Sequence, residues 1–316
     1  MAQKFKVSHD SPLLEYLFEI FPGQSRTGVK SYLKDGRVLV CGQECTAFDR
    51  PLKPGDTVEI ISKGASIGRD MKSDARETLG KQGVGIVYED DHIIVIDKNA
   101  GVPVSAPKAG SKDGRRQKSA MSLLNDYMHT EKRADIKAGT GNYKAPDRVF
   151  LVHRLDRDTS GLVLFTKDEY TKDLILSKWS EMMIEQRHVA AVEGRVKPAE
   201  GVIESWLSEN AKAQKMVSSR DITDGQKAVT LYKVIEERAR YSIVEFELET
   251  NRKNQIRVHA ASELRHPLVG DRKYGSVLAF GGRIALHART LVFKNPYGGR
   301  IMRFESPVPA CFDRLK

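Results

Sequence analysis

Apolar residues near the start of the chain recur at the spacing of an α-helix between residues 13 and 18. A second helical pattern follows, with Ser25 as its expected N-cap and Gly36 as its expected C-terminal stop. Short strand-like runs come next, each beside a turn that contains glycine. The pattern therefore predicts a small α+β module over residues 11–62.

Residues 83–316 are dominated by strand-like runs and are expected to form a larger domain. In the run 241–248, Val244, Phe246 and Leu248 alternate with glutamates, which is the pattern of a half-buried antiparallel strand. Many strands with few helices predict an α+β fold built on a mixed, mainly antiparallel sheet. The other predicted strands are 86–88, 92–96, 149–152, 162–165, 189–192 and 228–235.

The charge of the chain is basic, with 52 Lys and Arg residues against 42 Asp and Glu, a net charge of +10 over 316 residues. This length is enough for two domains. A basic balance attracts polyanions, and RNA, DNA and anionic membranes all qualify. A soluble basic protein without a polyanionic partner would have the same net charge, so the charge alone does not identify a partner.

The three cysteines indicate free thiols in a reducing compartment. Cys41 and Cys45 are separated by three residues, but no second pair completes a zinc site, so we expect no metal. The first residues contain no apolar signal core, and no run approaches the roughly 20 apolar residues of a membrane span. We therefore expect a cytoplasmic protein without a membrane partner.

The most informative stretch is the polar loop His153–Gly161, which lies between two apolar runs. This order predicts a strand–loop–strand unit, in which a rigid sheet holds the loop in place. The loop carries Asp156 and Asp158, flanked by Arg154 and Arg157. A carboxylate near guanidinium groups stays ionised and suits a nucleophile. A surface turn with ordinary ion pairs is the alternative.

The loop order H-R-L-D-x-D-T-S-G resembles the signature loop of the RluA-type pseudouridine synthases. A second block, from Thr250 to His259, resembles the pattern T-G-R-x-H-Q-I-R-x-H of that family, but has Asn251 and Asn254 in place of its glycine and first histidine. The resemblance implies that Asp156 is the catalytic carboxylate and that Arg257 pairs with it. A purely structural salt bridge is the other interpretation of Arg257, and the two roles are compatible.

The strand 187–194 departs from the family pattern Y-x-A-x-V-x-G, because His188 takes the place of the tyrosine. By resemblance this residue stacks on the target base and takes part in catalysis. A planar imidazole can still stack, and a pKa near neutrality would let it accept a proton. Arg154, by resemblance, fills the space that the flipped base leaves; otherwise it binds a phosphate or a loop carboxylate.

The N-terminal module resembles the S-four-like RNA-binding domain, named for a protein of the small ribosomal subunit. Arg26, Lys30 and Lys34 recur every four residues and therefore share one helix face, which Arg37 would extend. The resemblance implies that this face contacts structured RNA. An ordinary solvated helix face is the alternative.

Two further segments connect the predicted units. Residues 63–82 are polar without a clear apolar period, and we interpret them as a linker. Residues 105–149 carry ten basic and five acidic residues around a short predicted helix, 120–128. This basic insert is either an RNA-facing arm or a mobile loop, and its charge favours the arm.

Taken together, these patterns predict an RNA pseudouridine synthase, an isomerase that needs no cofactor and acts as a monomer. The appended module makes large-subunit ribosomal RNA the favoured substrate, with transfer RNA second. A non-catalytic RNA-binding or ribosome-assembly factor on the same fold is the rival hypothesis. His188, Asn251 and Asn254 support the rival, whereas the unbroken Asp156 loop argues against it.

Overall fold

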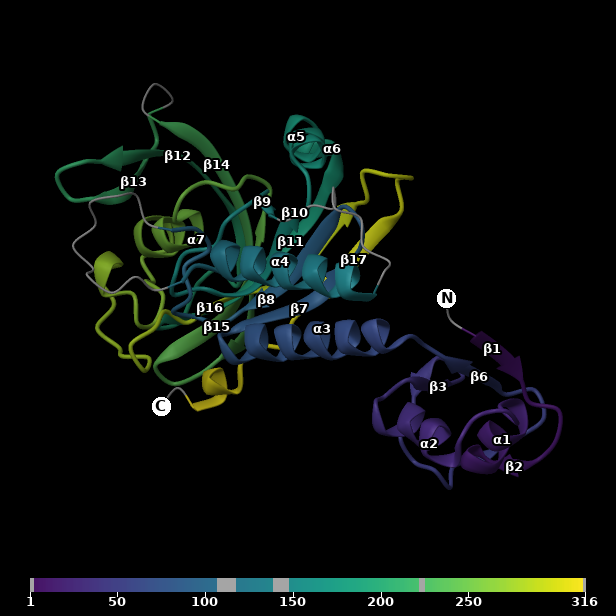
Figure 1. The fold of residues 1–316 in the computed structure, drawn as a ribbon. Coiled ribbons are helices and arrows are strands. Elements are labelled where there is room, and N and C mark those ends of the chain that lie inside the picture. The colour runs from purple at the N-terminus through teal and green to yellow at the C-terminus, as the bar shows by residue number, and fades with distance from the viewer. Residues whose placement is uncertain (1–2, 107–117, 139–147, 222–224, 315–316) are drawn as a thin grey trace. The chain divides into compact units, whose positions relative to one another are not determined.

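The chain forms two compact units in a computed structural model that describes residues 3–106, 118–138, 148–221 and 225–314. The units are Met1–Thr78 with Asp126–Asp147, and Leu79–Asn125 with Arg148–Lys316. Each unit combines helices with a β-sheet, and the larger sheet is mixed (Figure 1). The predicted α+β class is therefore confirmed, whereas the domain boundaries stay predictions.

The first unit begins with two short helices that share an apolar core with a four-stranded antiparallel sheet. The N-cap predicted at Ser25 is confirmed, because its Oγ accepts a hydrogen bond from the N–H of Gly28 at 3.1 Å. Gly36 follows the helix with a φ of 62°, a left-handed conformation typical of a helix stop. The elements are α1 (Leu13–Ile20), α2 (Arg26–Lys34), β1 (Gln3–Lys6), β6 (Thr57–Ile60), β3 (Val38–Val40) and β4 (Gln43–Glu44), with a separate pair β2 (Ser11–Pro12) and β5 (Pro51–Leu52).

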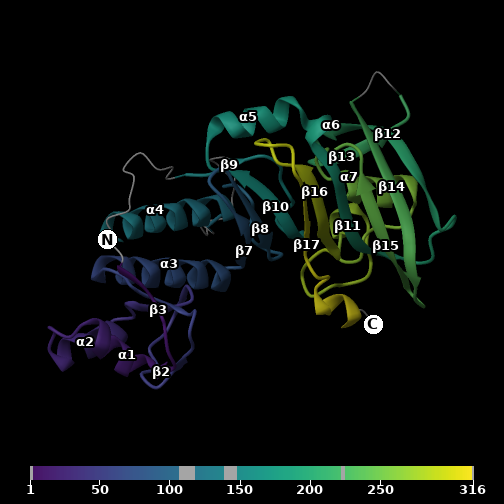
Figure 2. The same cartoon turned by 90° about the vertical axis from the view of Figure 1, so that its right-hand side faces the viewer.

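The predicted linker is largely helical, because α3 spans Lys63–Lys81. It lies beside α4, Ala120–Ala138, which extends the predicted helix 120–128 (Figures 1 and 2). Polar groups join the two helices: Lys72 Nζ lies 2.8 Å from Asp135, and Arg76 Nε donates to the Tyr127 hydroxyl at 3.1 Å. Because these contacts are polar, α3 lacks the regular spacing of apolar residues by which a helix is predicted from sequence.

Nearly half of the predicted basic insert cannot be compared with the structure, because residues 107–117 and 139–147 lie outside the described ranges. Its interpretation as an RNA-facing arm or a mobile loop therefore stays a prediction.

An eleven-stranded sheet forms the centre of the second unit among the described residues. Its main path runs β13-β12-β14-β15-β11-β16-β10-β8-β7, with β17 on β16 and β9 on β10. Every pairing in it is antiparallel except that of β10 with β16, so the predicted mixed, mainly antiparallel sheet is confirmed. The strands are β7 (Val84–Glu89), β8 (Ile93–Lys98), β9 (Phe150–Leu151), β10 (Ser160–Thr166), β11 (Met183–Glu193), β12 (Glu200–Asn210), β13 (Lys215–Ser219), β14 (Gln226–Glu237), β15 (Tyr241–Leu248), β16 (Leu286–Lys294) and β17 (Ile301–Glu305).

The helices of this unit are short and bring loops to the sheet. Asp168 caps α5 by accepting from the N–H of Thr171 at 2.7 Å. Ile256 and Ala260 pack with the strand residues Val244 and Phe246, which fixes the orientation of Arg257 between them. The elements are α5 (Glu169–Ser177), α6 (Trp179–Met182), α7 (Gln255–Val258), a π-helical turn (His259–Glu263) and two 3₁₀ turns (Arg272–Tyr274 and Ala310–Arg314).

Gly161 is required where β10 meets β16, and we expect Gly161→Ala to destabilise the fold. Its φ is 114°, and an added Cβ would lie 2.2 Å from the carbonyl oxygen of Ala288. Strained backbone and steric overlap together should lower the free energy of unfolding by about 2 kcal/mol or more. Urea denaturation measures this loss. Gly23→Ala is the control, because Gly23 has an ordinary φ and open space, and equal stability of the two variants would contradict the prediction.

Candidate active site

The loop between β9 and β10 carries the signature residues, and buried contacts hold it against the sheet. His153 is buried, and its Nε2 accepts a hydrogen bond from the backbone N–H of Leu164 at 3.0 Å. Leu155 is buried as well, and the N–H of Thr159 donates to the carbonyl of Asp156 at 3.1 Å, closing a turn. The predicted strand–loop–strand unit is therefore present, and Asp156 projects from its ordered turn.

Lys98 is fully buried at the end of β8 and holds the second half of this loop. Its Nζ donates to the carbonyl oxygens of Thr159 at 2.6 Å and Arg157 at 3.1 Å, and also to those of Val102 at 2.8 Å and Asn99 at 3.1 Å. Burial lowers the pKa of Lys98 to about 7. Sequence reasoning gave Lys98 no role, although its place at the start of the turn before Gly101 was a usable signal.

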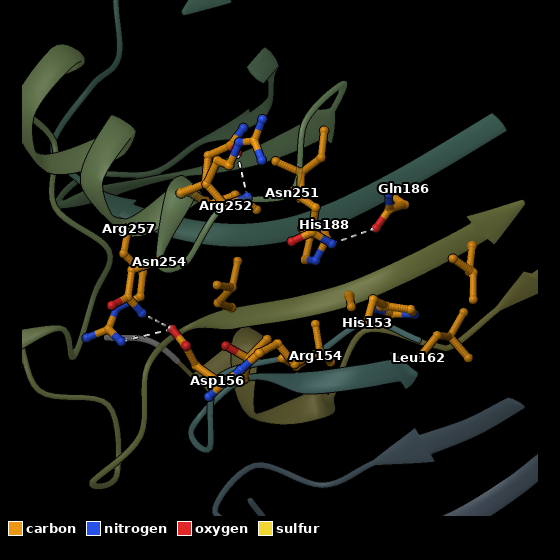
Figure 3. Close-up of a pocket in the computed structure, with 18 of the residues that line it drawn as sticks. His153, Arg154, Asp156, Leu162, Gln186, His188, Asn251, Arg252, Asn254 and Arg257 are labelled. Carbon is orange, nitrogen blue, oxygen red and sulfur yellow. Dashed lines mark hydrogen bonds and ion pairs between the residues drawn. The ribbon is translucent and has the colours of Figure 1, made fainter. Parts of the chain in front are cut away.

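Arg257 joins two carboxylates in the centre of the site (Figure 3). Its Nη1 donates to Asp156 Oδ2 at 2.9 Å, while Nε and Nη2 form a two-pronged pair with Asp271 at 2.7 and 2.8 Å. Burial by itself lowers the pKa of Arg257, but the bonds and charges of Asp271 and Asp156 outweigh it and raise the pKa above its ordinary value. The guanidinium is thus a permanent cation in a fixed orientation.

Asn254 gives Asp156 a second partner. Its Nδ2 donates to the same Oδ2 at 2.5 Å, from a left-handed backbone conformation that asparagine tolerates better than most residues. The Tyr274 ring lies 5.0 Å from the Arg257 guanidinium and completes its surroundings. Sequence reasoning counted Asn254 only as a departure from the family pattern, and gave Tyr274 no role.

Asp156, Asn254 and Arg257 line a pocket that is open to solvent. The side chain of Asp156 is 25% exposed, and its Oδ2 accepts both hydrogen bonds, from Arg257 and Asn254. Among the described residues Oδ1 has no hydrogen-bond partner. One oxygen of the carboxylate is therefore held, and the other is available to a bound molecule. The pocket lining also includes Arg154, His153, His188, Gln186, Ala288 and Thr290.

The sequence pattern of RNA pseudouridylate synthases matches residues 92–262, which is more than half of the chain. The chain belongs to this family. The predicted family and the predicted enzyme class, an isomerase, are thereby confirmed.

Several curated pseudouridine synthases resemble nearly the whole chain. "Ribosomal large subunit pseudouridine synthase D" of Pseudomonas aeruginosa is 32% identical over 315 residues, covering 93% of this chain and 87% of the relative. "Uncharacterized RNA pseudouridine synthase YlyB" of Bacillus subtilis is 31% identical over 289 residues, covering 90% and 86%. Among solved structures, "Human RNA Pseudouridylate Synthase Domain Containing 4" has a TM-score of 0.57 at 22% identity, covering 78% of this chain and 97% of that chain. This likeness supports the pseudouridine synthase fold.

In this pseudouridine synthase His188 lies on β11 and lines the pocket, as the sequence predicts, but its expected near-neutral pKa is wrong. Burial, with smaller contributions from His153 and His287, lowers the pKa of His188 to about 3. The exposed fraction of the residue is only 6%. At neutral pH the ring is therefore uncharged and is a poor proton acceptor.

Arg154 is exposed beside the pocket, and among the described residues it makes no hydrogen bond or ion pair. The side chain also borders a second groove, of about 910 Å³, together with Trp179 and Arg252. Arg154 is therefore a free cation next to Asp156. The alternative in which Arg154 pairs with a carboxylate of the loop is therefore wrong for this structure.

The predicted basic face of the first unit is only partly formed. Arg26, Lys30 and Lys34 are exposed along α2. Arg37 instead lies 4.5 Å from the Tyr32 ring and donates through Nε to the carbonyl of Ile61 at 2.8 Å. Tyr32 is about 160° from Lys34 around the helix axis, so Arg37 packs beside a different part of the helix, and its predicted role in RNA binding stays a prediction.

Within the described ranges, no group of three or more His, Cys, Asp or Glu residues is placed to hold a metal ion. In the same part of the chain, no helix has the length and apolar character needed to cross a membrane. All three cysteines are free.

The buried histidines of the pocket predict that the stability of this synthase falls as the pH drops from about 6.5 to about 4. Burial lowers the pKa of His153 to about 4 and of His188 to about 3, whereas in the unfolded chain both take up protons below about 6.5. The unfolded state then binds more protons, so stability is lost by up to about 1.4 kcal/mol per pH unit for each ring. Urea denaturation at pH 7 and pH 5 measures the slope, and His153→Gln should make it shallower; an unchanged slope would contradict the assignment.

Proposed function

We propose that this protein converts specific uridines of large-subunit ribosomal RNA into pseudouridine, with Asp156 as the catalytic carboxylate. The single observation that carries the proposal is the Asp156 carboxylate, held at one oxygen by Arg257 in an open pocket. Relatives named as ribosomal large subunit synthases, which match 93–95% of the chain, support the choice of RNA.

The reaction breaks the bond between N1 of uracil and C1′ of ribose, rotates the base, and forms a bond from C1′ to C5. The proton on C5 is lost and N1 gains one, so the product is an isomer and no redox partner is required. A carboxylate with one free oxygen can attack the sugar or the ring, or can remove a proton to form a glycal. All three routes begin with an ionised Asp156, which forms an ion pair with Arg257.

The base must first leave the RNA stack, at a cost of a few kcal/mol. In the proposal Arg154 occupies the space that the base leaves, because it is exposed and unpaired next to the pocket among the described residues. The exposed face of Arg26, Lys30 and Lys34 binds RNA phosphates in the S-four-like module. We further propose that the protein acts as a monomer in the cytoplasm.

Deleting the gene and mapping pseudouridines in cellular RNA tests this function. A large-subunit site that disappears, and that wild type restores but Asp156→Asn does not, supports the enzyme. If both forms restore growth equally and no modified site depends on the protein, the rival assembly-factor role replaces the proposal. If the dependent site lies in transfer RNA, the choice of ribosomal RNA is wrong.

A further inference from the structure

Four residues that line the same pocket each carry a buried side-chain atom that lacks a hydrogen-bond partner among the described residues. They are His153 Nδ1, Thr159 Oγ1, His188 Nδ1 and Thr290 Oγ1. The other buried atoms without such a bond, on Glu89, Glu185 and Arg187, belong to ion-paired side chains. An unsatisfied buried polar atom costs about 1–3 kcal/mol, so four of them around one pocket point to a polar molecule that binds there.

The tautomer of His153 follows from its neighbour. Its Nε2 accepts the backbone N–H of Leu164 at 3.0 Å, so this nitrogen carries no proton. Burial lowers the pKa of the ring to about 4, so the ring is neutral at pH 7. A neutral imidazole has one N–H, which must then lie on Nδ1. His153 therefore presents a hydrogen-bond donor to the pocket.

Strand geometry places Thr290 and His188 on the same wall. Alternate residues of a strand point to one face of the sheet, and the pocket lining takes Ala288 and Thr290 from β16 with Gln186 and His188 from β11. His188 pairs with Ala288 in the ladder and Thr290 pairs with Arg187, with a register shift between the two pairs. Figure 3 shows His188 and His153 on one side of the view, away from Asp156 and Arg257.

We propose that His153 and Thr290 form the wall that recognises the hydrogen-bonding edge of the flipped uracil while Asp156 faces its ribose end. This inference rests on the proposed function. Uracil presents carbonyl oxygens at C2 and C4 on either side of an N3–H. The N–H of His153 matches a carbonyl oxygen, and a hydroxyl can accept from N3–H. Cytosine has an amino group at C4 and an acceptor at N3, so its edge does not match the donors and acceptors of this wall.

Thr290→Val tests the wall with a nearly isosteric change. The lost hydroxyl has no protein partner among the described residues, so stability in urea should stay equal or rise. The kcat/KM for tritium release should fall about tenfold, on RNA labelled at C5 of uridine and taken from cells that lack the gene. Affinity for that RNA should change less than about twofold, because phosphate contacts dominate it.

Thr166→Val is the matched control, because Thr166 is a buried threonine of β10 whose hydroxyl donates to the carbonyl of Asp168 at 2.8 Å. It should lose stability but keep kcat/KM. A Thr290 variant that keeps wild-type kcat/KM, or that loses activity only in proportion to unfolding, would overturn the proposal.

Two amide variants of His153 test the roles of its two ring nitrogens separately. Glutamine can keep an acceptor for the Leu164 N–H but loses the Nδ1 donor, so His153→Gln should fold normally and lose about tenfold in kcat/KM. Asparagine can place an N–H near Nδ1, so His153→Asn should be less stable but more active than the glutamine variant. The reverse order of activities would overturn the assignment. If wild type itself releases no tritium, the proposed function fails and this inference falls with it.

Discussion

Asp156→Asn should reduce pseudouridine formation at least about 10⁴-fold, equivalent to roughly 5.5 kcal/mol of barrier. The amide keeps the size of the side chain and can still accept from Arg257, but it has no negative charge with which to attack or to remove a proton. Tritium release from RNA labelled at C5 of uridine measures the loss. RNA affinity should change little, because the carboxylate is one group in a large, phosphate-dominated interface.

Asp158→Asn is the matched control, since Asp158 lies in the same loop and, among the described residues, forms an ion pair with the half-exposed Arg157 at 3.3 Å. Its turnover should remain within about tenfold of wild type. Two variants with equal and severe losses would show that the loop needs both charges for its shape, and Asp156 would lose its assignment.

Asp271→Asn should combine the largest loss of stability with a loss of activity. Asp271 is 1% exposed and holds Arg257 through two hydrogen bonds. The amide would remove this negative charge, so the buried guanidinium would keep only one of its two carboxylate partners, Asp156. Breaking a buried ion pair costs about 3–5 kcal/mol. Arg257 would also lose the orientation that holds Asp156, so we expect kcat/KM to fall about 100-fold. Urea unfolding and tritium release measure the two effects.

Glu209→Gln provides the comparison with an exposed pair. Glu209 lies 2.6 Å from Lys253, but both side chains are about half exposed to water. Removing such a pair should cost no more than about 1 kcal/mol and leave turnover unchanged. If Asp271→Asn were as mild as this control, the buried pair would not be what positions Arg257.

The sequence predicts those parts of the site that lie in one continuous segment. Asp156 and Arg154 belong to a loop between two apolar runs, and Ser25 and Asp168 are caps whose bonds are local. Arg257 was found because the family motif that contains it is also continuous. In each case the information lies within about ten residues of the chain.

The remaining parts depend on contacts between distant segments. Asp271 meets Arg257 only because a loop returns to the start of α7, and nothing near Asp271 in the sequence specifies that partner. The low pKa of His188 comes from burial in the middle of the sheet, which a strand pattern does not quantify. The guanidinium of Arg37 packs on the ring of Tyr32, a contact that its position just past the helix does not reveal.

The arrangement of one guanidinium between two carboxylates has a consequence for every route open to the reaction. In each of the proposed routes Asp156 becomes an ester or takes up a proton, so it gives up its negative charge midway through the cycle. Arg257 is then left with Asp271 alone, as an electrically balanced couple beneath the substrate. Arg257 therefore still has a carboxylate partner in Asp271 after Asp156 has lost its charge.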